Sequence, residues 1–265
     1  MSEPLLVVEP RGHAARELAS LDVDRLRTKS EIRNALERGG RGAVWVAPSL
    51  AAVQLLLAAL AGHSKGDHRL LSLEPANSTR HSLLHAIFRF VVSADEGIRM
   101  LPLDELADVL GAANREDLFV GVAVAPADAA VVLYRGNLEP LIVPLGWFRT
   151  RPGGPKPETA DLAIADSGQT VGLGEYEAAA DAILYEFDAA YRRRAKKREV
   201  ERDDSFGGAL RRLRLQKGLR RSDFDGITAK EIARIERGEV KKPHPRTVAL
   251  LAERLGVPAR SIRTH

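Results

Sequence analysis

Short apolar blocks at helical spacing fill the C-terminal part of the chain and constrain its fold more than any other feature. Between Phe206 and Ile262, apolar residues recur in blocks that glycines and prolines separate. The pattern predicts several short helices packed around one small core. The expected core residues are Leu210, Leu213, Phe224, Ile227, Ile232, Ile235, Val248, Leu251, Leu255 and Ile262.

Charge is divided unevenly along the chain. From Arg192 to His265 there are 22 Lys and Arg residues against 10 Asp and Glu, a net charge of +12. The remaining residues carry 18 basic against 26 acidic side chains, so the total of +4 hides an acidic body and a basic tail. A compact, basic helical unit is typical of DNA-binding modules. The alternative is a charged face that is only solvated.

A tight turn divides the basic segment. Gly226 supplies the open backbone geometry that a sharp turn needs, and Ile227 can bury its side chain in the core. Thr228 is a good N-cap for a following helix, expected from about Ala229 to Arg237. Two helices joined by such a turn are typical of a module whose second helix enters the major groove.

The face of this second helix opposite its isoleucines carries the candidate DNA contacts. Ala229 and Ala233 are small enough to allow close approach or to contact a thymine methyl group. Lys230 and Arg234 can donate hydrogen bonds to N7 and O6 of guanine. Thr228, at the start of the helix, belongs to the same expected DNA-facing group.

Taken together, these motifs resemble the Cro/C1-type helix-turn-helix, the xenobiotic-response-element family of bacterial and phage regulators. The resemblance covers about a quarter of the chain. It rests on LRRLRLQKGL (Leu210 to Leu219), IARIERG (Ile232 to Gly238), the region of Pro243, and LAERLGV (Leu251 to Val257).

The resemblance implies roles for four further residues. Family members commonly pair an Arg of the first helix of the domain with the Glu that ends the helix expected from Ala229 to Arg237. Here these residues are Arg214 and Glu236. Such a partly buried pair orients the helices more than it adds net stability. Lys241 and Lys242 match a loop that touches DNA phosphates in the family.

The chain departs from the family pattern before the turn. The family usually has about three more residues there, whereas Phe224 and Asp225 lead straight into Gly226, so we expect the preceding helix to be about one turn shorter. Arg220 and Arg221 stand where the family favours Ser-Gln or a similar polar pair. Both are expected to contact DNA, either at bases or at phosphates.

The N-terminal body, residues 1–112, alternates strand-like and helical runs and predicts an α/β or α+β domain. Strands are expected at Leu5–Val8, Ala43–Ala47 and Leu70–Leu73. Helices are expected from Pro48 to Gly62, from about Arg80 to Ser93 after an Asn77 cap, and from Pro102 to Leu110.

Residues 113–187 predict a small β-rich domain with a closing helix. Leu118–Val124, Ala130–Tyr134 and Leu141–Val143 are β-like runs, and Arg135-Gly136-Asn137 reads as a turn. Together with the segment VPLGWF, residues 115–187 resemble a small uncharacterised domain often found near toxin–antitoxin genes. That resemblance implies an interaction or regulatory module.

From Ala178 to about Arg202 the chain is rich in strong helix formers, and residues 188–204 predict a charged helical linker. Its basic half can lie along phosphates or serve as a solvated spacer. With residues 205–265 as the all-α DNA-binding domain, the expected architecture is an α+β multidomain protein.

Several classes of function lack their signals. There is no cysteine, hence no thiolate zinc finger or Cys nucleophile, and no HExxH or phosphate-loop motif. His81 and His85 lie at a metal-compatible i, i+4 spacing, but no third ligand is evident nearby. No apolar run reaches the ~18 residues of a membrane span, and the acidic N-terminus does not resemble a secretion signal. We therefore expect a cytoplasmic protein, associated with the nucleoid when bound to DNA, without catalytic residues, metal or cofactor.

Three functions remain. The first is a sequence-specific transcription regulator, a dimeric repressor whose tail reads double-stranded DNA while the body dimerises or senses. The second is an antitoxin whose body binds a partner protein while the tail autoregulates the operon. The third is an enzyme with a DNA-targeting tail.

Overall fold

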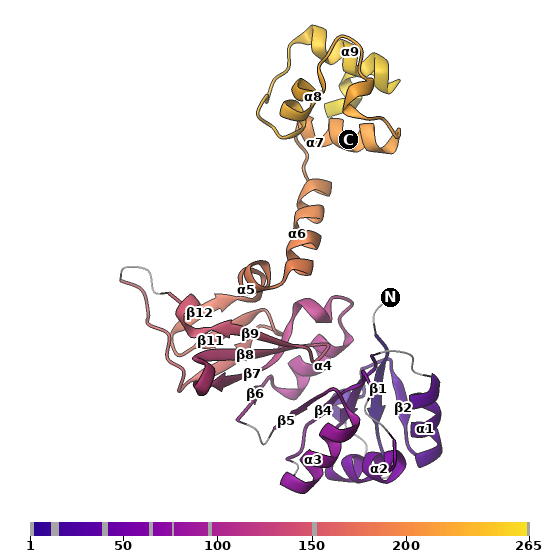
Figure 1. The fold of residues 1–265 in the computed structure, drawn as a ribbon, viewed down its shortest axis with the longest axis vertical. Coiled ribbons are helices and arrows are strands. Elements are labelled where there is room, and N and C mark those ends of the chain that lie inside the picture. Colours follow the sequence, from indigo (N-terminus) through magenta and orange to yellow (C-terminus); the bar gives the residue numbers. More distant parts are fainter. Residues whose placement is uncertain are drawn as a thin grey trace. The chain divides into compact units, whose positions relative to one another are not determined.

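The chain folds into two compact units, Met1–Asp188 and Ala189–His265 (Figure 1). The computed structural model describes residues 3–11, 16–38, 42–63, 66–75, 77–94, 97–149 and 153–263. Mixed helix and strand, with an all-helical C-terminal part, agrees with the fold class expected from the sequence. Within the described ranges, no helix is long and apolar enough to cross a membrane.

The first unit begins with a five-stranded parallel sheet in the order β2-β1-β3-β4-β5. Its strands are β1 (Leu5–Val8), β2 (Asp24–Leu26), β3 (Val44–Ala47), β4 (Arg69–Ser72) and β5 (Phe90–Ser93). Strands β1, β3 and β4 are buried along their whole length, as expected for a parallel sheet covered on both faces.

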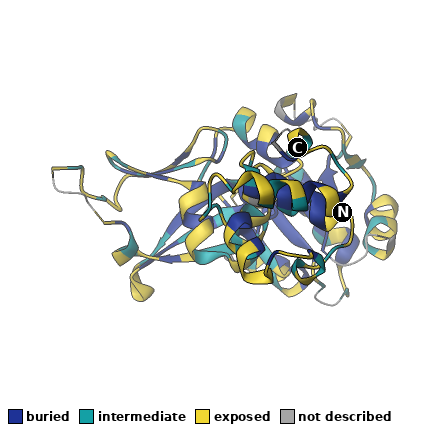
Figure 2. Ribbon diagram, turned by 90° about the horizontal axis from the view of Figure 1, so that it is seen from above, coloured by how far each residue is buried: buried dark blue, intermediate teal, exposed yellow. Residues whose placement is uncertain are grey.

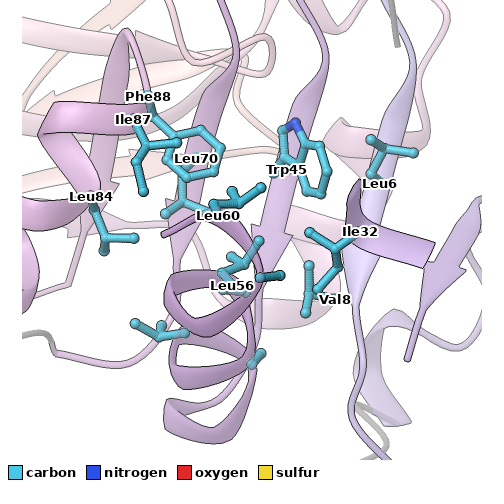
Figure 3. Close-up of a cluster of buried hydrophobic side chains, with 14 of the residues drawn as sticks. Leu6, Val8, Ile32, Trp45, Leu56, Leu60, Leu70, Leu84, Ile87 and Phe88 are labelled. Carbon is cyan, nitrogen blue, oxygen red and sulfur yellow. The ribbon is translucent and has the colours of Figure 1, made fainter. Parts of the chain in front are cut away.

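Three helices cover one face of this sheet: α1 (Lys29–Arg38), α2 (Leu50–Leu60) and α3 (Ser78–Ile87). The crossovers from β2 through to β5 all advance in the same direction, and right-handed connections therefore put their helices on the same side. Between helices and sheet lies a core in which Leu56 and Leu60 of α2 pack around Trp45 of β3 (Figure 3).

The 3₁₀ helix η1 (Arg16–Leu18) and the helix α4 (Leu103–Gly111) do not lie with the three helices α1 to α3. The step from β1 to β2 runs against the direction of the other crossovers, which places η1 on the opposite face. Helix α4 contacts both η1 and strand β7 (Phe119–Ala125), so it lies where the parallel sheet gives way to antiparallel structure.

Two antiparallel sheets complete the first unit. One has the order β6-β7-β8-β9 and the other β10-β11-β12, and β10 contacts β6 and β7. The remaining elements are β6 (Arg99–Met100), η2 (Arg115–Asp117), η3 (Pro126–Asp128), β8 (Ala130–Arg135), β9 (Pro140–Pro144), η4 (Leu145–Trp147), β10 (Leu162–Ala165), β11 (Thr170–Leu173), β12 (Tyr176–Ala179) and α5 (Ala180–Phe187).

A buried arginine ties the parallel sheet to the antiparallel part. Arg69 of β4 donates to the carboxylate of Glu3, to the carbonyl oxygen of Asn137 at 3.2 Å and to Oε1 of Glu139 at 2.9 Å. Asn137 and Glu139, in the turn between β8 and β9, are thus hydrogen-bonded to β4. The expected domain boundary at residue 112 therefore falls inside this unit, and β6, which precedes it, pairs with β7, which follows it.

Two helices expected from the sequence were wrong in extent. The helix expected from Arg80 to Ser93 ends at Ile87, and Phe90–Ser93 is strand β5, paired with β4. β-branched Val91 and Val92 are buried there in a parallel ladder, which outweighs the helical spacing. The continuous helix expected from Ala178 is instead the end of β12, then α5, a break at Asp188, and a separate helix.

The second unit is all helical. It consists of α6 (Ala189–Glu201), α7 (Phe206–Gln216), η5 (Arg221–Asp223), α8 (Ala229–Glu236), α9 (Pro245–Leu255) and η6 (Ala259–Arg263). Its core contains every residue expected from the sequence except Val248, together with Ala252. Val248 is only half-buried. Along the helices, buried positions alternate with exposed ones, the pattern of amphipathic packing (Figure 2).

Candidate DNA-binding site

Helix α8 begins at a well-formed cap. Gly226 has φ +78°, a left-handed conformation that suits glycine, and the chain then enters the core at Ile227. Oγ1 of Thr228 accepts a hydrogen bond from the backbone N–H of Glu231 at 3.1 Å, which satisfies one of the free donors at the helix start. The expected turn and N-cap are both present, so Thr228 has a structural role whether or not it also touches DNA.

The two faces of α8 differ sharply. Ile232, Ile235 and Glu236 are buried, with Ile232 fully enclosed. The opposite face carries Lys230 and Arg234, one helical turn apart and both exposed, as is Ala229 at the start of the helix, whereas Ala233 is half-buried. One face of α8 thus packs into the core, while the other exposes two long basic side chains to solvent.

A close contact with α7 seats this helix. A Cβ atom added to Gly207 would lie 2.2 Å from the carbonyl oxygen of Ile235, far inside contact distance. Only glycine lets the start of α7 approach the end of α8 so closely. The orientation of α8 therefore depends on a residue that bears no side chain and that the sequence reading had not singled out.

A charged cluster links the end of α8 to two other elements. Arg214 of α7 donates from Nε to Oε1 of Glu236 at 2.6 Å and from a terminal nitrogen to Oε2 at 3.3 Å, with both residues buried. The structure thus brings together the two residues of the family's pair. A third residue joins them, because Nε of Arg221 donates to Oε2 of Glu236 at 2.8 Å.

The segment before the turn is short, as the departure from the family pattern implied. In place of a full helix there is a single 3₁₀ turn, η5. The exposed Arg220 precedes it, and its backbone N–H donates to Oδ2 of Asp223 at 2.8 Å. The side chain of Arg221 keeps 42% of its surface exposed while its Nε is held by Glu236. Arg221 is thus anchored at one end and open to solvent at the other.

An exposed carboxylate sits beside the basic face of α8. Oε1 of Glu239 accepts from Nε of Arg237 at 2.6 Å and Oε2 accepts from Nε of Arg234 at 3.2 Å. The hydrogen bond from Arg237, with smaller contributions from its charge and from Arg234, lowers the pKa of the Glu239 carboxyl group. Arg234 must exchange this partner for a base edge if it is to read DNA.

The loop after α8 presents two lysines. Lys241 and Lys242 are both exposed. With Phe206, Pro243 and Val248 they line a cavity of about 350 Å³. Helix α9 begins directly afterwards, with His244 as its N-cap. The loop therefore connects α8 to α9 and exposes both lysines to solvent.

The comparison with known protein families agrees with this geometry. Residues 205–263 match a family model described as a helix-turn-helix domain, and this range spans α7 to η6. This part of the chain is a helix-turn-helix domain. The match is to a Cro/C1-like family, the one that the sequence motifs resemble. No curated protein and no solved structure matches the chain.

Sequence reasoning missed two further residues of the helix-turn-helix domain. Arg237 is exposed and lies one more turn along the face of Lys230 and Arg234, a spacing that the sequence does contain. Arg254 of α9 donates from Nε to the carbonyl oxygen of Asp223 at 2.6 Å and so ties η5 to α9. That second contact has no signal in the sequence, because it depends on how the short turn packs.

The histidine pair of the body was the one metal candidate of the sequence. Nε2 of His81 and Nε2 of His85 lie 2.9 Å apart on α3, so one ring donates a hydrogen bond to the other. Among the described residues, no group of three or more His, Cys, Asp or Glu side chains could hold a metal ion.

Proposed function

We propose that the protein is a sequence-specific DNA-binding transcription regulator, a dimeric repressor whose helix-turn-helix domain reads its operator. The observation that carries the proposal is the exposed basic face of α8, whose opposite face is locked into the domain core by Ile232, Ile235 and Glu236. In a helix-turn-helix, the N-terminal part of the second helix contacts base edges. In this proposal the chain acts by binding, without a catalytic step, metal or cofactor.

The proposal assigns the basic side chains to two classes. Lys230 and Arg234, with Ala229 and Ala233 beside them, face the bases. Lys241 and Lys242 contact phosphates, which position the domain without reading sequence. Thr228 anchors the start of the reading helix. Arg220 and Arg221 are phosphate contacts in this arrangement, because Arg221 is anchored through Nε and presents only its outer end.

The proposal includes a dimer because of how helix-turn-helix domains contact DNA. One helix-turn-helix domain covers a single half-site, and dimers span half-sites about 34 Å apart. The first unit, with its own sheets and core, supplies a large surface for pairing and for sensing a signal. A repressor of this kind acts in the cytoplasm, where it meets the nucleoid.

Footprinting on the DNA upstream of the protein's own gene tests the proposal. We expect a discrete protected stretch with two-fold symmetric halves, appearing at concentrations well below those that coat unrelated DNA. The double variant Lys230→Ala/Arg234→Ala, which leaves the core of the domain untouched, is the matched control and should lose the discrete footprint while retaining weak general binding. Uniform coating of all DNA by the unaltered protein would refute sequence-specific regulation.

An antitoxin is the alternative. It is favoured by the separation of the chain into a DNA-binding unit and a larger unit with its own core, since the larger unit is free to bind a partner protein. The resemblance of residues 115–187 to a domain found near toxin–antitoxin genes remains a prediction. Co-purification of the product of a neighbouring gene, in a fixed ratio and with relief of that protein's toxicity, would support this function over the first.

A further inference from the structure

Helix α6 is rich in basic residues. Six of its 13 residues are Lys or Arg and two are Glu. Arg193, Lys196 and Lys197 are exposed and lie at i, i+3 and i+4, so three like charges share one face and repel one another. Glu201 offsets one of them, at 3.8 Å from Lys197. Solvated spacer helices usually alternate charges of opposite sign along a face. In α6 the basic side chains come first, and Glu199 and Glu201 follow only at the end of the helix.

The other side of α6 carries Tyr191. Tyr191 is buried, and the guanidinium groups of Arg194 and Arg198 lie 5.9 Å and 5.4 Å from its ring centre, within the range of cation–π contact. Arg194 and Arg198 are thus directed to the tyrosine side of the helix. Arg193, Lys196 and Lys197 lie on the opposite face and are exposed to solvent.

Hydrogen bonds order the junction between α6 and the helix-turn-helix domain. A terminal nitrogen of Arg212 on α7 donates to the carbonyl oxygen of Asp203 at 2.6 Å and to that of Glu201 at 3.3 Å. Oδ1 of Asp203 accepts from the backbone N–H of Ser205 at 2.9 Å, and Ser205 is the N-cap of α7. A Cβ atom on Gly208 would lie 2.2 Å from the Asp203 carbonyl oxygen, so the turn packs directly onto α7.

We propose that α6 is a second DNA-binding element, whose face of Arg193, Lys196 and Lys197 contacts backbone phosphates that flank the stretch read by α8. The inference rests on the proposed function, and it adds a partner surface outside the matched helix-turn-helix domain. The occupant is the DNA backbone because the surface is cationic and belongs to the same compact unit as α8. A helix of 13 residues is about 20 Å long. It can therefore follow several phosphates.

The test measures how the affinity of the full-length protein for its operator depends on salt. The variant Arg193→Gln/Lys196→Gln/Lys197→Gln removes three charges from the face and keeps good helix formers. Its matched control is Lys29→Gln/Arg99→Gln/Lys156→Gln, which removes three exposed charges from the first unit and changes the net charge equally. Far-UV circular dichroism establishes that both variants keep the helix content of the unaltered protein.

Each phosphate contact contributes about 0.9 to the slope of log affinity against log salt. We expect the α6 variant to lose about 2.7 from that slope, so the loss of affinity between 50 and 200 mM salt shrinks by about 40-fold. Hydroxyl-radical footprints should shorten at their flanks while protection at the centre remains. The control variant should keep the slope and the full footprint.

Three results would overturn the inference. An unchanged slope and footprint in the α6 variant would show that this face does not touch DNA. An equal change in both variants would show an effect of net charge alone. If the unaltered protein gives no discrete footprint, the proposed function fails and this inference with it, whereas a discrete footprint with an unchanged slope in the variant removes only the role of α6.

Discussion

At the scale of single residues, the carboxylate of Glu236 organises the helix-turn-helix domain. Only 1% of its side chain is exposed, and it is held between the guanidinium groups of Arg214 and Arg221. A buried charge is tolerated only when it is paired and hydrogen-bonded. The cluster therefore fixes the relative placement of α7, η5 and α8, and its three members should differ in how much they matter.

We predict the order of destabilisation Glu236→Ala, then Arg214→Ala, then Arg221→Ala. Removing Glu236 leaves the buried Arg214 without its counter-charge, which should cost about 3–5 kcal/mol. Removing Arg214 leaves Glu236 with Arg221 still beside it and should cost about 1.5–3 kcal/mol. Arg221 is 42% exposed, so its loss should cost less than about 1 kcal/mol. Urea unfolding of each variant measures the order, and an Arg221 variant as unstable as the Glu236 variant would contradict it.

Gly207 is the second residue on which the placement of α8 depends. Gly207→Ala forces a methyl group against the carbonyl oxygen of Ile235, and we expect it to destabilise the domain by about 1–3 kcal/mol. It should also weaken DNA binding by shifting α8. Gly146→Ala is the control, because no atom lies within 4 Å of a Cβ there and its φ is not positive. Thermal unfolding compares the melting temperatures of the two variants. Equal values would contradict the structural role of Gly207.

At the scale of elements, strand β9 shows how the first unit protects an edge. The hydrogen bonds Leu145 N–H to Ala129 and Arg135 N–H to Glu139 set the alternation of the ladder. The backbone polar groups of Pro140, Ile142 and Pro144 therefore point away from β8, toward the open edge of the sheet. Two of these three positions are prolines without an N–H group, which hinders the addition of another strand.

We therefore expect Pro140→Thr/Pro144→Thr to promote self-association through this edge. The change restores two outward N–H groups beside Ile142, whose side chain is already 61% exposed. Light scattering during incubation at moderate temperature should show larger species than for the unaltered protein. Pro157→Thr, in a loop, is the control. Equal scattering from both variants would indicate that the prolines do not guard the edge.

The elements also show what the sequence could and could not predict. In the C-terminal domain the apolar spacing, the Thr228 cap and the shortened segment before Gly226 were all readable, because short helices with local caps carry their own signals. Strand β5 could not be predicted, because Val91 lies at a helical spacing from the leucines of α3. Only the pairing of this segment with β4 makes it a strand. Long-range pairing has no local signature. The hydrogen bond from Arg221 to Glu236 could not be predicted either, because it joins residues that are distant in the sequence.

At the scale of the whole molecule, the charge division found in the sequence corresponds to the division into two units. The second unit, from Ala189, holds all the residues that give the tail its net charge of +12. The first unit is acidic overall, so we expect the basic second unit to be the one that binds DNA. Binding to DNA and binding to a second copy or another protein can therefore be assigned to different units.

We predict that the first unit makes the protein a dimer. Light scattering coupled to size exclusion at micromolar concentration should give twice the chain mass of 28.9 kDa. The triple variant of α6 should keep this mass, since its changes lie in the second unit. A monomer that nevertheless binds one operator tightly would contradict the dimeric arrangement and require a single half-site.

The central claim is that α8 reads bases while the loop after it holds phosphates, and one set of binding curves tests it most directly. The affinities of Lys230→Ala, Arg234→Ala, Lys241→Ala and Lys242→Ala are measured on the operator, on single-base variants of it and on unrelated DNA. We predict that the two α8 variants lose ~1–3 kcal/mol on the operator and discriminate less between sequences. The two loop variants should bind all DNA about equally more weakly, with a salt slope shallower by about 0.9 each. If the α8 variants lose affinity uniformly across sequences, with no change in preference, then α8 does not read the major groove.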